Sequence, residues 1–182
     1  MGSKFLFAAA ALLAASPAAA AVSVIGSTAA QSCYEAAGAK GVQGPDVIRM
    51  CDEALRQEGL SHEDRVATLV NRGILKARAG AIGEAIADYD AALSGDPDQA
   101  EAYLNKGFAL LNLSEAGDQA KPMFDTALAK KTRRPELAYY GRAVAHELSG
   151  QVRAAYLDYR QASRIDPKWR QPKLDLARFR VN

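Results

Sequence analysis

The sequence predicts an all-α protein, an α-solenoid in which antiparallel helix hairpins stack side by side. The first observation is a glycine that recurs at one constant interval, at Gly73, Gly107 and Gly141. The second is an alanine that recurs at nearly the same interval, at Ala92, Ala127 and Ala162. The third is an Asp-Pro pair that ends two of the helical stretches, at residues 96–97 and 166–167. Self-similarity with a period of roughly 34 residues is typical of a solenoid rather than of a globule with a single core.

The composition is that of a globular chain with room for one ordinary domain. Of the 182 residues, 49% are hydrophobic and 24% are charged, and the net charge is +2. So small a net charge gives no overall bias toward nucleic acid or a membrane surface, and nucleic acid is not expected as a partner.

Residues 1–21 differ from the rest of the chain and predict a signal peptide. Lys4 supplies a short positive region, residues 5–15 form an unbroken apolar run, and residues 16–17 interrupt it. The small residues that follow form a signal-peptidase cleavage pattern that ends at Ala20 or Ala21. The apolar run at 5–15 is too short to span a bilayer. The alternative is an ordinary apolar N-terminal helix. With cleavage, we expect an exported protein without stable membrane insertion, in the bacterial periplasm because the leader is alanine-rich and has one lysine.

A flexible segment is expected at 22–28, followed by a partial N-terminal repeat at 29–60. This repeat has helices at about 29–37 and 45–57, and the apolar residues of the second helix align one by one with those of the first full repeat. Three full repeats are predicted at about 66–99, 100–134 and 135–168 within a domain that spans 61–182. Their helices are expected at about 61–79, 82–94, 99–113, 118–130, 136–149 and 151–165, and a basic capping helix at about 170–181.

Cys33 and Cys51 are the only cysteines, and an even count in an exported chain favours a disulfide over a metal site or a catalytic thiol. Cys51 occupies the repeat position of Tyr89 and Tyr159. Cys33 precedes it by the same interval by which Gly141 precedes Tyr159. The two cysteines should therefore face each other across the partial hairpin, although two unlinked core cysteines are the alternative.

The glycines, alanines and aromatics at these offsets resemble the tetratricopeptide repeat (TPR) pattern. The pattern is incomplete at residues 131–134, where the Asp-Pro pair is missing. In this family the first helix of each repeat, the A helix, lines a concave groove that receives an extended peptide or a partner helix. The resemblance therefore implies a non-catalytic scaffold that binds a protein or peptide of unknown identity in the cell envelope.

Repeat position then selects the groove residues that the resemblance implies. They are Val70, Asn71, Ile74, Arg78, Leu104, Asn105, Phe108, Asn112, Ala138, Tyr139, Arg142 and His146. Chaperone-binding members of the family hold a C-terminal carboxylate with set basic and amide residues, of which only Asn105 is matched here. That mode of recognition is not expected.

The alternative function is anion binding by Lys130, Lys131, Arg133 and Arg134 together with the basic C-terminal helix. Such binding would weaken steeply with salt. His62 and His146 show no metal-ligand spacing, and the chain has no phosphate-binding loop, nucleophile elbow or paired-carboxylate motif. No metal, cofactor or enzymatic activity is therefore expected.

Overall fold

The structure is a computed structural model that describes residues 20–24, 28–39, 41, 44–57, 59–113 and 117–179. The expected leader therefore lies almost entirely outside the described residues. Within the described ranges the chain forms nine α-helices and no β-strand. The helices are α1 (Thr28–Gly38), α2 (Pro45–Arg56), α3 (His62–Arg78), α4 (Ile82–Gly95), α5 (Ala100–Leu111), α6 (Gly117–Ala129), α7 (Pro135–Leu148), α8 (Val152–Ile165) and α9 (Gln171–Leu176).

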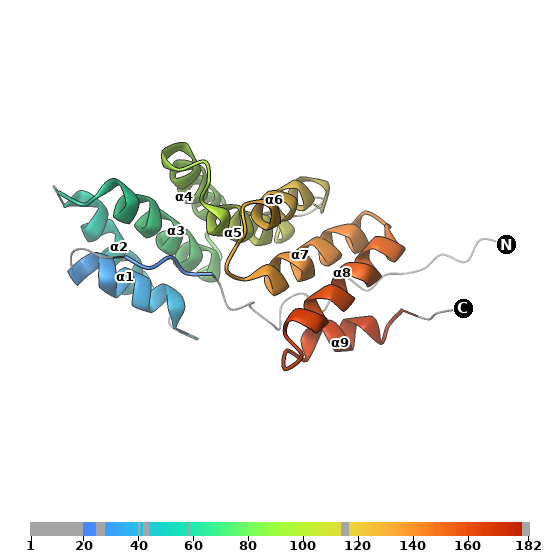
Figure 1. The fold of residues 1–182 in the computed structure, drawn as a ribbon. Coiled ribbons are helices and arrows are strands. Elements are labelled where there is room, and N and C mark those ends of the chain that lie inside the picture. Colours follow the sequence, from blue (N-terminus) through green and yellow to red (C-terminus); the bar gives the residue numbers. More distant parts are fainter. Residues whose placement is uncertain are drawn as a thin grey trace.

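Successive helices pair into hairpins, and the hairpins stack in one row that ends with α9 against α8 (Figure 1). The predicted α-solenoid, with three full repeats, a partial N-terminal repeat and a C-terminal cap, is therefore confirmed. The A helices of the full repeats are α3, α5 and α7, and their second, or B, helices are α4, α6 and α8.

Local sequence signals set the helix ends. The Ser61 side chain accepts a 3.0 Å hydrogen bond from the backbone N–H of Asp64 at the start of α3, as the capping pattern predicts. Gly80 follows α3 with a positive φ of 82°, which glycine adopts at no steric cost. After α8, the Asp166 side chain accepts hydrogen bonds from the backbone N–H groups of Lys168 and Trp169, at 3.0 and 3.2 Å.

Close packing of the hairpins depends on glycine beneath aromatic rings. A Cβ on Gly73 would lie 2.5 Å from the ring of Tyr89, and one on Gly141 would lie 2.3 Å from the ring of Phe124. The atoms closest to both positions are ring carbons, because a flat ring fills the space that a missing side chain leaves.

The disulfide predicted between Cys33 and Cys51 is present, and it joins α1 to α2. The two Cα atoms are 5.0 Å apart, and both cysteines are fully buried in the core that α1 and α2 share with α3. The partial repeat is thus fixed covalently as well as by packing.

Two expectations need correction. Val22 and Val24 are buried and belong to the hydrophobic core, so they are not part of a flexible segment. Helix α9 ends at Leu176, well short of the predicted 181. Trp169, between α8 and α9, packs against Tyr140 of the A helix α7, with ring centroids 4.8 Å apart.

None of the helices in the described ranges is both long and apolar enough to cross a membrane.

Candidate functional site

The surface that carries Asn71 on α3 and Asn105 on α5 is the candidate site, and we call it the A-helix face. These two asparagines are one repeat apart and occupy the same position in successive repeats. Tyr139 occupies that position on α7. The stacking of repeats therefore aligns two buried amide side chains on neighbouring helices.

Both amides bind the backbone of the chain's own residues 20–24, which lie across α3 and α5. The Asn71 Nδ2 donates to the Val22 carbonyl at 2.7 Å, and the Val22 N–H donates to the Asn71 Oδ1 at 2.9 Å. The Asn105 Nδ2 donates to the Ala20 carbonyl at 3.1 Å and to the Glu101 carbonyl at 2.8 Å. An amide offers a donor and an acceptor together, so it can hold a peptide backbone whatever side chains that peptide has.

Side chains of residues 20–24 alternate between the protein and solvent. Ala20, Val22 and Val24 are only 5%, 8% and 5% exposed, whereas Ala21 is half-buried and Ser23 is exposed. This alternation is that of an extended strand lying flat on a surface. The A-helix face therefore accommodates an extended peptide that presents an apolar side chain at every second position.

Several residues predicted to line the groove lie in the cores that the segment completes. Val70 and Ile74 are buried in the core that contains Val22 and Val24. Leu104 and Ala138 are buried in the core that contains Ala20. These four side chains supply apolar surface beneath the segment, whereas the polar contacts come from the two asparagines.

Other predicted residues contact their own helices or neighbouring rings. The ring of Phe108 packs edge-on against Phe124, with centroids 5.1 Å apart. Asn112 is exposed and its Nδ2 donates to the Phe108 carbonyl at 2.9 Å. Tyr139 is half-buried, and the Arg142 guanidinium lies 5.3 Å from its ring centroid.

The charged residues predicted for the groove, and His146, make contacts within the fold. Arg78 donates to three carbonyls at the end of α1, those of Ala36, Ala37 and Ala39, at 3.3, 2.7 and 3.1 Å. It therefore satisfies carbonyl groups that a helix C-terminus leaves without intrahelical partners. His146 is buried, and its Nδ1 lies 2.7 Å from the Gln151 side chain.

Arg142 is held by a network that occurs twice in the chain. It binds Asp158 of its own repeat through two hydrogen bonds of 2.7 and 2.8 Å, and Asp125 of the preceding repeat at 2.7 Å. The hydrogen bonds that Arg142 donates to Asp158, helped by the one it donates to Asp125, raise the pKa of Arg142 above its usual value although burial opposes this. Arg142 therefore ties two successive B helices together.

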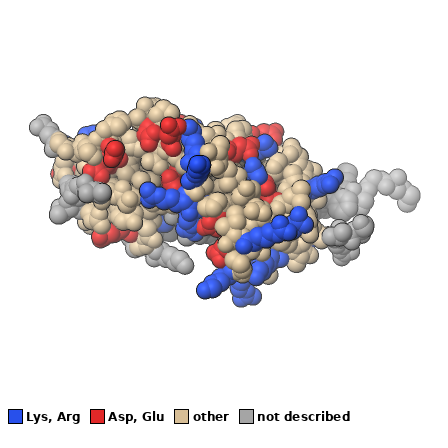
Figure 2. Space-filling view, viewed as in Figure 1, with Lys and Arg blue, Asp and Glu red and all other residues tan. Residues whose placement is uncertain are grey.

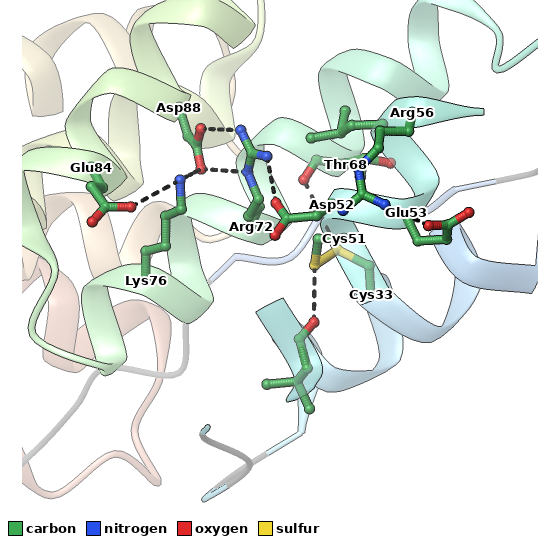
Figure 3. A network of polar contacts seen from close by, with 12 residues as sticks. Cys33, Cys51, Asp52, Glu53, Arg56, Thr68, Arg72, Lys76, Glu84 and Asp88 are labelled. Carbon is green, nitrogen blue, oxygen red and sulfur yellow. Dashed lines mark hydrogen bonds and ion pairs between the residues drawn. A yellow bond between two sulfur atoms is a disulfide. The ribbon is translucent and has the colours of Figure 1, made fainter. Parts of the chain in front are cut away.

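The same network surrounds Arg72 in the first full repeat (Figure 3). Arg72 binds Asp88 at 2.9 and 2.6 Å and Asp52 of α2 at 2.7 Å, and Lys76 adds a 3.0 Å ion pair to Asp88. Neither network was predicted from the sequence. The signal that would have found them is their equal spacing, since Arg142 follows Arg72 by the same two-repeat interval by which Asp158 follows Asp88.

A hollow beside residues 20–24 extends the candidate site toward the N-terminal ends of the A helices. It has a volume of about 590 Å³ and is bordered by Ser23, by His62 and Glu63 of α3, and by Arg133 before α7. His62 is exposed, as expected, and its Nε2 lies 3.0 Å from the Gly95 carbonyl. The segment therefore leaves part of this surface open.

The basic loop of the anion-binding alternative is partly neutralised within the chain. Lys130 forms an ion pair with Asp98, and Arg134 forms one of 2.5 Å with Glu136. Lys131 and Arg133 are exposed. In the view of Figure 2, Lys and Arg side chains gather most densely over α8 and α9. In the described part of the chain, no group of His, Cys, Asp or Glu side chains is placed to hold a metal ion.

Comparison with known proteins agrees with this architecture. A family model described as TPR repeat matches residues 77–114. A solved structure of MamA 41-end from Desulfovibrio magneticus RS-1 is 22% identical with a TM-score of 0.65, and the match covers 82% of each chain. A MamA RS-1 ArsTM double mutant is 24% identical with a TM-score of 0.61, and covers 72% of this chain and 70% of that one. A search of curated proteins found no match. At these sequence identities, the similarity to the solved structures shows a shared fold.

Proposed function

We propose that this chain, a tetratricopeptide-repeat protein by its repeat motif and its fold, is a non-catalytic module for protein–protein interaction. It binds an extended peptide segment of a partner on the A-helix face. The observation that carries this proposal is the binding of residues 20–24 by Asn71 and Asn105. A surface that holds one extended backbone in this way has the chemistry to hold another.

The polar residues of the A-helix face bind the main chain of the peptide, and the apolar residues contact its side chains. The amides of Asn71 and Asn105 bind main-chain groups and set the register of the peptide, because each can pair only where a carbonyl or N–H is presented. The buried side chains beneath, such as Leu104, supply contact area for inward-facing residues of the peptide. A partner is therefore selected by its extended conformation and its alternating apolar side chains.

The predicted leader supports an exported protein, and we place the module in the bacterial periplasm. Its partners would then be proteins of the cell envelope.

A pull-down from an envelope extract tests the proposal. The bait carries Asn71→Ala and Asn105→Ala together, with Asn112→Ala as the matched control because Asn112 is an exposed asparagine at the end of α5. We expect the double variant to lose proteins that the wild-type and control baits retain, while circular dichroism shows unchanged helix content. Recovery of the same proteins by all three baits would contradict the proposal.

The basic surface over α8 and α9 favours a second candidate, binding of an anionic partner through Lys131, Arg133 and the C-terminal basic residues. Exposed charges are screened by salt within roughly 10 Å at 0.1 M, so such binding would weaken steeply as salt is added. Binding on the A-helix face, which rests on amide hydrogen bonds and apolar contact, would change little. A salt titration of the recovered partners separates the two candidates.

A further inference from the structure

We infer that residues 20–24, of which Val22 to Val24 remain after either expected cleavage, are an autoinhibitory segment, which occupies the A-helix face in cis and must be displaced when a partner peptide binds there. This inference rests on the proposed function. The A-helix face would then be blocked by the chain itself. A competing peptide must match the alternating apolar side chains of residues 20–24.

Residues 20–24 bind the A-helix face in one register. Three hydrogen bonds connect it to Asn71 and Asn105, and both asparagines are themselves buried, at 0% and 6% exposure. The Ala20 and Val22 carbonyls belong to alternate residues, on the same edge of an extended strand. A shift by one residue would turn Val22 and Val24 toward solvent, so the pairing fixes which side chains face inward.

The inward positions define the chemistry of a competing peptide. Position 20 lies over the core of α5, α6 and α7 and holds a small side chain, whereas positions 22 and 24 hold β-branched valines in the core of α1 to α4. A competitor would be an uncharged extended stretch with a small residue followed by β-branched residues two and four positions later. Of the outward positions, 23 tolerates a polar residue because it is exposed, whereas Ala21 is half-buried against the core.

The short tether makes the segment an effective blocker. Only residues 25–27 separate Val24 from Thr28, the first residue of α1. A ligand tethered this closely has an effective concentration in the millimolar range or above. The apparent affinity for a free peptide is reduced by the fraction of molecules in which the face is open, so freeing the face should tighten binding at least ~10-fold.

A pair of double variants separates inward from outward positions. Val22→Asn with Val24→Asn places two polar amides in the core, whereas Ala21→Asn with Ser23→Asn, the matched control, places the same groups at a half-buried and an exposed position. The probe is a fluorescein-labelled, end-capped peptide with the sequence of residues 19–25, titrated against the full chain by fluorescence anisotropy. We expect the inward variant to bind it at least ~10-fold more tightly than the wild type and the control. Adding Asn71→Ala to the inward variant should abolish binding.

The outcomes distinguish failure of this inference from failure of the proposed function. Equal binding by wild type, inward and outward variants, lost in each with Asn71→Ala, would overturn the autoinhibition and leave the binding face intact. Binding that survives Asn71→Ala, or no binding to any variant, would overturn both. Hydrogen exchange on the wild type covers the case in which the inward variant fails to fold. Excess peptide should accelerate exchange of the Val22 amide while the amides of α4 and α6 stay protected, and unchanged Val22 protection with peptide bound would refute displacement.

Discussion

At the scale of single residues, the aromatic side chains of the B helices pack against the glycines of the A helices. Tyr89 is 1% exposed, and its ring covers Gly73 of the facing A helix. Tyr89→Ala should reduce the free energy of unfolding by about 3–5 kcal/mol, because it empties a large aromatic site in a packed core. Urea denaturation measures this, with the half-buried Tyr139→Ala as control. Equal losses for the two variants would show that the packing described for Tyr89 is wrong.

Asp125 gives the fold a dependence on acid. Burial alone would raise the pKa of this carboxyl, but hydrogen bonds from Lys121 and Arg142, at 2.8 and 2.7 Å, outweigh it and lower the pKa below its usual value. A carboxyl with a lower pKa in the folded chain stabilises the fold above its unfolded pKa of about 3.9. That stabilisation is lost as the pH falls through the lower folded pKa.

Asp125→Asn should therefore make the free energy of unfolding less dependent on pH below about pH 4. Urea titrations from acidic to neutral pH measure the effect, with Asp46→Asn as the control because Asp46 is exposed and pairs with the exposed Arg49 on the same helix. A pH dependence that is the same in wild type and Asp125→Asn would count against the network around Arg142.

At the scale of elements, the disulfide should stabilise the α1–α2 hairpin. Closing a loop between cysteines 18 residues apart contributes about 3 kcal/mol in the chain-entropy model. Reduction should therefore expose the amides of α1 and α2 to hydrogen exchange first and leave α3 to α8 largely protected. Mass spectrometry of non-reduced peptides tests the bond itself, since free thiols at both positions in oxidised, folded protein would rule it out.

The N-terminal segment links the expected processing of the chain to the A-helix face. The small residues predict a mature protein that begins at Ala21 or Val22. Either cleavage would remove the Ala20 carbonyl that Asn105 binds while leaving Val22 beside Asn71. Mass spectrometry of protein from the host cell envelope should find one of these two N-termini. An intact Met1 in extracytoplasmic protein would contradict it.

Most helices could be predicted from sequence because each repeat packs with the same residue types at the same positions. Glycine, alanine and aromatic residues recur where hairpins touch, so the bounds of α1 to α8 follow from them to within a few residues. The cap α9 is shorter than predicted; it packs on α8, and its Asp175 accepts a 2.9 Å hydrogen bond from Tyr140 of α7. The disulfide was predictable because Cys51 takes the place of a core aromatic in the repeat register.

The candidate site was less predictable. Asn71 and Asn105 followed from repeat position, but nothing local in residues 20–24 indicates that they bind those amides, which are 49 and 85 residues away. An extended segment with small side chains carries no helical periodicity by which it could be placed. Arg78 and Arg142 were assigned to the groove by repeat position. In the structure Arg78 donates hydrogen bonds to carbonyls of α1, and Arg142 donates to carboxylates of the B helices.

At the scale of the whole molecule, each repeat depends on its neighbours for burial of its apolar face. Residues 20–24 cross from the core of the central repeat to that of the N-terminal repeats, since Ala20 packs in one and Val22 in the other. Binding and displacement of an extended segment on this face therefore act on two repeats at once. The central claim is that the A-helix face, through Asn71 and Asn105, is where a partner peptide binds.

The side-chain amide signals of Asn71, Asn105 and Asn112 in a ¹⁵N-labelled sample test this claim most directly. In the Val22→Asn, Val24→Asn variant, whose own segment leaves the A-helix face open, titration with the unlabelled end-capped peptide of residues 19–25 should shift the Asn71 and Asn105 side-chain signals and the backbone signals of α3 and α5. The Asn112 side-chain signal and the backbone signal of Lys131 should stay in place. Shifts confined to Lys131 and α9, with Asn71 and Asn105 unmoved, would contradict the claim and favour the basic surface as the binding site.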